Sequence, residues 1–295
     1  MATLRDIRRR IKSVEGTQKI TKAMKMVAAA KLRRAQQRIV EARPYARKMH
    51  EVLSSLALRA SPEAHPLLAR RVGTHKAGGD RKGLVVIAAD KGLCGAFNSN
   101  ILRKAMDFLK ATPEAELRVT LIVVGRKARD FFRRRPYLLR SEYAYIFDKL
   151  DYTHGARIGR DIVDAYVGGE LDEVYLVYNE FKSAGIQRVV VEKLLPIEPL
   201  GVEEGLAPID FIYEPSPQAI LDQLLPRHVE VQVYRALLES VAAEHGSRMT
   251  AMEAATQNAA DMIAALTLVY NKARQEKITK ELLDIVGGAE ALRKR

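Results

Sequence analysis

The chain has 295 residues, of which 47% are hydrophobic and 6% aromatic, with 49 Lys and Arg against 36 Asp and Glu. This composition excludes wholesale disorder, and a single cysteine excludes a disulfide framework or a cysteine-built zinc site. The longest apolar runs are far below the roughly 20 residues of a membrane helix, and the first residues lack the apolar stretch of a signal peptide, so we expect a soluble protein without membrane insertion.

The first segment, residues 1–59, carries nearly all of the excess positive charge. It holds 16 Lys and Arg against 4 Asp and Glu, whereas residues 60–226 hold 23 of each sign and residues 227–295 hold 10 against 9. Such a run is either a solvated helical face or a surface for an acidic partner. Because solvated faces usually mix both signs, we favour an acidic partner.

Apolar residues of this segment alternate at spacings of four and three, which is typical of a coiled-coil helix. The alternation consists of Ala28, Leu32, Ala35, Ile39, Ala42, Ala46, Met49, Leu53 and Leu56, and upstream of Leu4, Ile7, Ile11 and Val14. Between the two stretches it falls on Gln18, Thr21 and Lys25, so we expect an interrupted seam there. The apolar side chains turned elsewhere are Ile20, Met24 and Val27. Pro44 should kink the helix or force a local adjustment.

The middle of the chain alternates between strand and helix patterns, which predicts an α/β domain. The expected strands are Gly83–Asp90, Arg118–Gly125, Glu173–Phe181, Ile186–Leu195 and a short Asp210–Tyr213; the expected helices are Asn98–Lys110, Arg126–Arg135 and Gly155–Val167. Ser183 to Gly185 separate two of the strands and predict a hairpin. Prolines and glycines in residues 61–82 predict a linker.

A second long helix is expected near the C-terminus. Its alternation consists of Met252, Ala255, Ala259, Met262, Leu266, Val269 and Ala273. Two helices of this kind would each be roughly 75–90 Å long, far more than the roughly 19 Å radius of gyration of a compact globule of this length. They must run antiparallel, because the chain enters the middle domain from one helix and leaves it into the other.

Only one loop has a pattern that could carry chemistry. Asp90–Asn98 joins a strand to a helix and contains Gly92 and Gly95, so it could cradle a phosphate. It has no G-x-G-x-x-G, and Lys91 precedes the glycines instead of following them, so we favour a tight structural turn. Cys94 is expected to be a packed thiol, and the six histidines occur singly. We expect no catalytic, cofactor or metal site.

The last segment, Ile278–Arg295, has more apolar positions than one helical stripe needs. A helix end far from its own domain would bury them against another protein. The alternative is that the segment folds back on the chain's own helix, and the pattern alone does not separate the two.

Four segments carry a resemblance to a known family. Thr17–Lys31 (TQKITKAMKMVAAAK), Gly92–Asn98 (GLCGAFN), Tyr213–Pro226 (YEPSPQAILDQLLP) and Val269–Ala289 (VYNKARQEKITKELLDIVGGA) closely resemble the gamma subunits of F-type rotary ATP synthases, in the same order and at nearly the same length. The resemblance implies a central rotor shaft, which is a non-catalytic subunit coupling proton flow to ATP synthesis or hydrolysis by rotation. It implies the alpha and beta subunits, the epsilon subunit and the membrane ring of c subunits as partners, and no nucleic acid. It also implies a peripheral position on the cytoplasmic side of a bacterial plasma membrane.

The expected architecture is therefore an α/β fold in which the N- and C-terminal helices form a long antiparallel coiled coil around a central Rossmann-like α/β domain. We expect the N-terminal helix in residues 1–59, a linker in 60–82, the α/β domain in 83–217 and the C-terminal helix in 218–295. The resemblance places contacts with the catalytic subunits on Lys22, Met24, Lys25, Arg274, Gln275, Thr279 and Glu281.

Two other classes of function fit parts of the sequence. A basic coiled-coil protein that binds nucleic acid would explain the charge of residues 1–59, but it would leave the apolar C-terminal segment unexplained. A dinucleotide-binding enzyme would explain the α/β middle, but the glycine fingerprint is missing. Co-purification separates the three classes, because a rotor should be isolated with six larger nucleotide-binding subunits.

Overall fold

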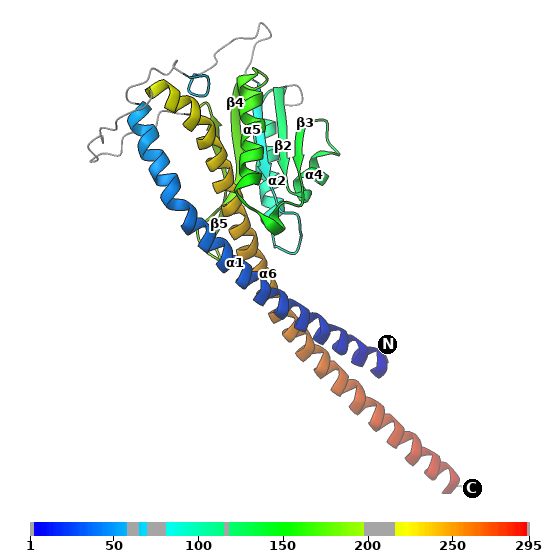
Figure 1. Cartoon of the computed structure of the whole chain (residues 1–295). Helices are drawn as coiled ribbons and strands as arrows, with labels where there is room; N and C mark the ends of the chain where they lie inside the picture. The colour runs from blue at the N-terminus through cyan, green and yellow to red at the C-terminus, as the bar shows by residue number, and fades with distance from the viewer. Residues whose placement is uncertain (1–2, 58–64, 70–80, 115–117, 198–215, 294–295) are drawn as a thin grey trace. The chain divides into compact units, whose positions relative to one another are not determined.

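The computed structural model describes residues 3–57, 65–69, 81–114, 118–197 and 216–293 (Figure 1). These residues form two compact units, one made of residues 28–248 and the other of residues 1–27 and 249–295. The long helices α1 (Leu4–Ala57) and α6 (Pro217–Arg293) each pass through both units. The parts of α1 and α6 that belong to the larger unit share a core with the sheet.

The larger unit is built on a five-stranded sheet with the order β3-β2-β1-β4-β5. Its strands are β1 (Lys82–Ile87), β2 (Val119–Val124), β3 (Leu138–Tyr143), β4 (Glu173–Phe181) and β5 (Gln187–Leu195). The first four strands pair in parallel, and β4 and β5 form the expected antiparallel hairpin. Strand β3 was not predicted from the sequence, because its residues LLRSEY are only half-buried at a sheet edge and show no apolar run.

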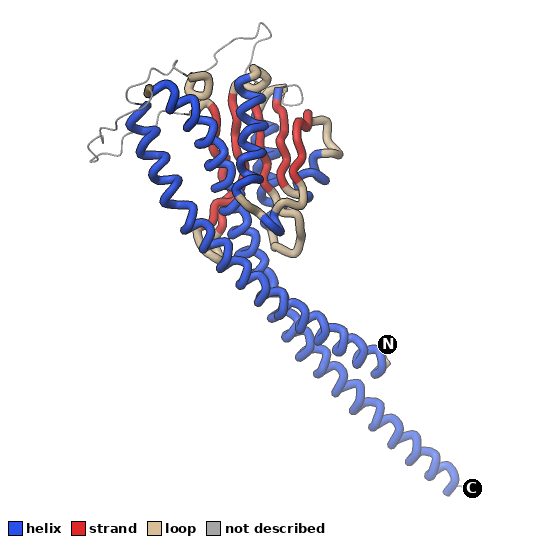
Figure 2. Tube along the Cα trace, in the orientation of Figure 1, coloured by secondary structure: helices blue, strands red, loops and turns tan. Residues whose placement is uncertain are grey.

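Helices cover both faces of this sheet, so alternate residues of the central strands enter two separate cores (Figure 2). On one face Val85 and Ile87 of β1 pack with α5 (Tyr152–Val167) and with parts of α1 and α6. On the other face Leu84 and Val86 pack with α2 (Phe97–Ala111) and α4 (Arg126–Phe132). The Rossmann-like arrangement expected from the alternating pattern is confirmed.

Helix α5 lies unusually close to α6 because two glycines face it. A Cβ atom at Gly155 would come within 2.6 Å of the Tyr234 side chain, and one at Gly159 within 2.8 Å of the Glu230 Cα. Any larger residue would therefore push the two helices apart. The turn of α6 that contains Glu230 therefore packs directly against α5 of the sheet domain.

Some expectations fall on residues that the structure leaves undescribed. The short strand at 210–213 lies outside the described residues, as does most of the expected linker. Within that linker, however, Leu67 is fully buried in the first core, and its carbonyl accepts a hydrogen bond of 2.9 Å from the Ile197 amide. Helix α1 continues through Pro44, and α6 continues through Pro226.

The smaller unit is an antiparallel pair formed by the start of α1 and the end of α6 (Figure 1). The hydroxyl groups of Thr21 and Thr256 lie 2.7 Å apart across the pair. Thr21 is buried, so the alternation continues through Gln18, Thr21 and Lys25 with polar side chains. The expected interruption is therefore wrong for the seam itself, although Ile20 and Val27 do turn outward as expected.

The contact between the two threonines fixes the register of the pair. Counting outward from it in opposite directions sets Gln18 level with Ala259, Val14 with Ile263, Ile11 with Leu266, Ile7 with Tyr270 and Leu4 with Ala273. The seam of α6 therefore uses Ile263 and Tyr270, which are half-buried. Two positions predicted for it, Met262 and Val269, are instead 53% and 54% exposed. The predicted seam is wrong by one residue at these two positions. Met262 and Val269 follow the preceding seam residue by three positions and Ile263 and Tyr270 follow it by four, and both spacings occur in a coiled coil.

This register is testable with two neighbouring substitutions. We expect Ile263→Asp to destabilise the helix pair by several kcal/mol, because it places a charge in the seam, and Met262→Asp to cost less than about 1 kcal/mol. Thermal unfolding of the two variants measures the difference. Equal losses, or a larger loss for Met262→Asp, would show that the seam follows the other spacing.

Candidate functional site

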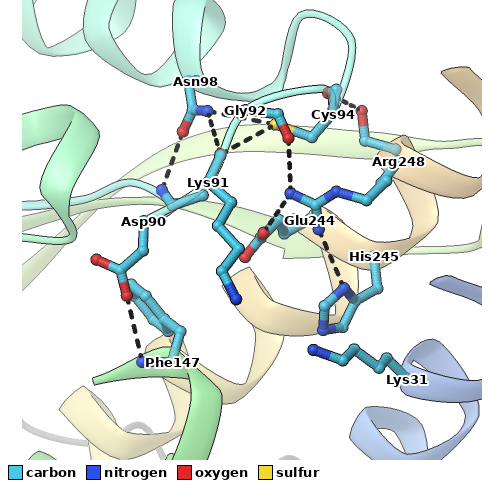
Figure 3. A network of polar contacts seen from close by, with 12 residues as sticks. Lys31, Asp90, Lys91, Gly92, Cys94, Asn98, Phe147, Glu244, His245 and Arg248 are labelled. Carbon is cyan, nitrogen blue, oxygen red and sulfur yellow. Dashed lines mark hydrogen bonds and ion pairs between the residues drawn. The ribbon is translucent and has the colours of Figure 1, made fainter. Parts of the chain in front are cut away.

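The loop Asp90–Asn98 follows β1 at the carboxyl edge of the sheet. The parallel neighbours β2 and β4 lie on opposite sides of β1, so the order in which the chain adds strands reverses here. In open α/β sheets this switch point is where ligands usually bind. Here the chain's own helix α6 fills the position (Figure 3). The Arg248 guanidinium donates a 3.0 Å hydrogen bond to the Gly92 carbonyl, and the Ser247 hydroxyl donates one of 2.7 Å to the Cys94 carbonyl.

The loop is also held from within. The buried Asp90 carboxylate accepts hydrogen bonds from the backbone amides of Arg126 and Tyr145 at 2.8 and 2.9 Å. The Asn98 side chain accepts one from the Ala89 amide and donates one to the Lys91 carbonyl. Every one of these bonds is made to the protein's own backbone, which supports the interpretation of the loop as a tight structural turn.

A charged network surrounds the loop and includes both long helices. The Arg248 guanidinium lies 2.7 Å from the Glu244 carboxylate, and both side chains are about nine-tenths buried. Asp148 pairs with Lys91 at 2.8 Å and with Lys31 of α1 at 3.8 Å. These pairs bring α1, α6, the 90–98 loop and the connection after β3 together in the larger unit.

Burial and hydrogen bonding shift the pKa values of the network. Burial raises the pKa of Glu244 although Arg248 opposes the shift. It also lowers the pKa of His245 to about 4, and the cations of Arg248, Lys31 and Lys91 add to that effect. A hydrogen bond from Lys91 lowers the pKa of Asp148. Neutral His245 can therefore accept the 3.3 Å contact from the Arg248 guanidinium.

Only the glycines of the loop indicated this part of the molecule in the sequence, and nothing indicated the network itself. Glu244 and Arg248 have the i, i+4 spacing that is common on solvated helices, so their burial is visible only once α6 is placed against the loop. Cys94 is buried with its thiol pKa raised by burial, as expected for a packed thiol. Within the described residues no cluster of His, Cys, Asp and Glu could hold a metal ion.

The pH dependence of stability should report on His245. Its folded-state pKa lies below the ordinary value of 6.5, so between pH 6.5 and about 4 the unfolded chain binds a proton that the folded chain does not. Stability is therefore lost as the pH falls through this window. We expect His245→Gln, whose amide can still accept from Arg248, to recover about 1–3 kcal/mol at pH 4.5 relative to pH 7.5.

Denaturant unfolding of the original protein and of His245→Gln at the two pH values isolates this contribution. The raised pKa of Glu244 changes stability with pH in the opposite direction, but it does so in both proteins and is removed by the comparison. A variant that loses stability with falling pH as steeply as the original protein would show that His245 is charged in the folded state.

The residues that the family resemblance placed in partner contacts all belong to the smaller unit. Lys22, Arg274, Gln275, Thr279 and Glu281 are exposed, whereas Met24 and Lys25 are half-exposed. The Lys25 ammonium lies 2.5 Å from the Glu253 carboxylate across the helix pair. Lys25 therefore differs from Lys22 and Arg274, because its charge is already balanced within the chain, as is that of Glu281 by Lys277 at 3.6 Å.

The end of α6 extends past the start of α1 (Figure 1). Beyond Ala273, which lies level with Leu4, residues 274–289 are exposed on all sides. They include Ile278, Leu282, Leu283, Ile285 and Val286, each between 48% and 72% exposed. The fold-back of this segment, which the sequence left open, does not occur in residues 274–289. No helix in the described part of the chain is long and apolar enough to span a membrane.

The fold and the site define a class of protein. It combines a Rossmann-like sheet domain, whose crevice is closed by its last helix, with an antiparallel pair of terminal helices. A family model described as ATP synthase matches residues 3–292, so the chain belongs to the ATP synthase family.

Three relatives illustrate the match. The ATP synthase gamma chains of Anaeromyxobacter sp. strain Fw109-5 and strain K are 52% and 51% identical, and that of Geotalea uraniireducens is 47% identical. Each alignment covers 99% of this chain and 100% of the relative.

Solved structures agree with this assignment. A chain of the Tetrahymena thermophila mitochondrial ATP synthase central stalk and c-ring is 31% identical, with a TM-score of 0.59, over 80% of this chain and 99% of that one. A chain of the Euglena gracilis mitochondrial ATP synthase, from its OSCP/F1/c-ring structure, has a TM-score of 0.67 at 21% identity, over 98% of this chain and 94% of that one. The second match supports the fold alone.

Proposed function

We propose that the protein is the central rotor shaft of an F-type ATP synthase, coupling proton flow through a membrane ring to ATP synthesis or hydrolysis by rotation. The observation that carries the proposal is the exposed apolar end of α6, residues 274–289, on an antiparallel helix pair. Such a surface needs a protein sleeve to cover it. Full-length gamma-chain relatives and a central-stalk neighbour support the same role.

The shaft would act through contacts and not through bond chemistry. Its two helices present different side chains around the pair, so a ring of surrounding subunits would meet a different surface in each direction. A contact that is equally strong at every angle changes no equilibrium, whereas one that forms at some angles biases a catalytic site toward one of its states. Coupling then follows from the asymmetry of the shaft surface.

The proposed partners follow from the family. The alpha and beta subunits would surround the helix pair, and the epsilon subunit and the ring of c subunits would contact the larger unit. The proposed location is the cytoplasmic side of a bacterial plasma membrane, held there by these partners. We expect the chain to bind no nucleotide of its own, because the loop that could cradle a phosphate is bonded to α6.

The contact residues proposed for the catalytic ring are Lys22, Met24, Lys25, Arg274, Gln275, Thr279 and Glu281. Lys22 and Arg274 carry exposed charges that pair with no acidic side chain in the described part of the chain. Lys25 should contribute less, because a partner carboxylate must compete with Glu253 for its ammonium.

The first experiment removes the charge of Arg274. Each partly exposed charged contact should be worth about 1–3 kcal/mol, so Arg274→Ala should reduce ATP-driven proton pumping several-fold in a complex that still assembles. Lys272→Ala is the matched control, since Lys272 is an exposed cation on the same turn. Equal pumping by both variants, with normal subunit content, would show that Arg274 is only a solvated charge.

A second experiment compares two lysines of α1. We expect Lys22→Ala to lower pumping several-fold and Lys25→Ala to lower it by no more than about twofold, because a half-exposed ion pair within the chain is worth about 1 kcal/mol or less. Pumping and ATP hydrolysis are measured on the same purified complexes. The reverse order would mean that Lys25 leaves Glu253 and binds a partner.

A further inference from the structure

The network around the 90–98 loop lies where both long helices leave the larger unit. Arg248 is the last residue of that unit on α6, and Lys31 lies within one turn of Ala28, its first residue on α1. Both residues belong to the network, Arg248 through the Gly92 carbonyl and Lys31 through Asp148. A torque applied to the outer part of α1 or α6 would therefore act on this network before it acts on the rest of the larger unit.

The contacts at this loop are the polar contacts of α6 nearest to the end of the larger unit. Other polar contacts of α6, such as that from Arg235 to Glu192 of β5, lie earlier in the helix. Apolar side chains such as Val233 and Leu237 are buried in the first core and hold α6 against the sheet by close packing. The hydrogen bonds from Arg248 and Ser247 end on backbone carbonyls of a loop that Asp90 and Asn98 hold in place. Directional bonds to a fixed backbone oppose rotation.

Burial makes these bonds hard to exchange with water. Arg248 and Glu244 are 9% and 6% exposed. A guanidinium in this position can release the Gly92 carbonyl only by leaving that carbonyl and itself without an equivalent partner. Figure 3 shows the guanidinium between the loop, Glu244 and His245, each on a different side.

We infer that Arg248, with Ser247, is a positioning residue that transmits torque between α6 and the sheet domain by fixing the rotational setting of the helix on the 90–98 loop. Glu244 holds the guanidinium in place. The inference rests on the proposed rotor function, which supplies the torque. In this inference the crevice at the carboxyl edge of the sheet transmits torque and does not bind a ligand.

The test removes the directional bonds and keeps the packing. In the double variant Glu244→Leu/Arg248→Met both buried charges are lost together, so no unpaired charge remains. In complexes assembled with this chain and reconstituted in vesicles, we expect ATP hydrolysis to persist and the number of protons pumped per ATP hydrolysed to fall several-fold. The control is Lys48→Met/Glu51→Leu, which removes an exposed ion pair within α1 and should leave the ratio unchanged.

Two milder variants keep the inference falsifiable if the double variant does not assemble. Glu244→Gln retains the bond from Arg248 to Gly92 and should keep most of the coupling, whereas Ser247→Ala loses the bond to Cys94 and should lower the ratio by about twofold under a proton gradient. Amide hydrogen exchange of residues 91–98 should rise in the double variant and in Ser247→Ala. A purely structural role predicts loss of thermal stability in proportion to loss of coupling.

The outcomes separate the inference from the rotor function. If complexes with the unaltered chain pump protons, and the double variant or Ser247→Ala pumps as many per ATP as they do, the inference is wrong and the rotor function stands. If the unaltered chain does not assemble with nucleotide-binding subunits or supports no pumping, the proposed function fails. Faster exchange of the loop amides in the isolated chain would still establish the contact.

Discussion

The helix pair of the smaller unit depends on one narrow seam, because the described residues of that unit form only the two helices. Only one stripe of each helix is buried, and the rest of the surface remains available for contacts. The polar layer at Thr21 and Thr256 is part of this constraint, since the two hydroxyl groups satisfy each other and so permit polar side chains in the seam. The outward side chains Ile20 and Val27 are left free for other proteins.

A structural feature could be predicted from the sequence where it depends on neighbouring residues in the chain, and not where it depends on contacts between distant segments. The strands β1, β2 and β4 and the helices α1 and α6 follow from apolar periodicity, because burial on both faces or along one stripe leaves a pattern in the sequence. The edge strand β3 leaves none. The seam of α6 was misplaced at Met262 and Val269, since Met, Ile, Val and Tyr all satisfy an apolar position, and only the partner helix decides between adjacent ones.

The network at the 90–98 loop was harder to predict from the sequence than the seam of α6. Its members come from four separate segments, and each is an ordinary residue in its own segment. Glu244 and Arg248 look like a solvent-exposed helical pair, and Asp148 looks like one of many loop carboxylates. These residues form a network only because the fold brings distant segments of the chain together. The same packing closes the crevice, which would otherwise have indicated a ligand site. The family resemblance suggested contact residues that stay a proposal, and it included the loop segment Gly92–Asn98, but it pointed to neither Glu244 nor Arg248.

The unsupported end of α6 has an energetic consequence of its own. Residues 274–289 continue α6 and need no new helix nucleus, but no other part of the described chain packs against them, and most helical stability in proteins comes from such packing. Much of the free energy that keeps them helical must therefore come from whatever covers their apolar side chains. Helix formation and assembly are then thermodynamically linked in this segment: part of the conformational entropy of the chain is lost only when the complex forms, so the measured affinity understates the strength of the contacts made.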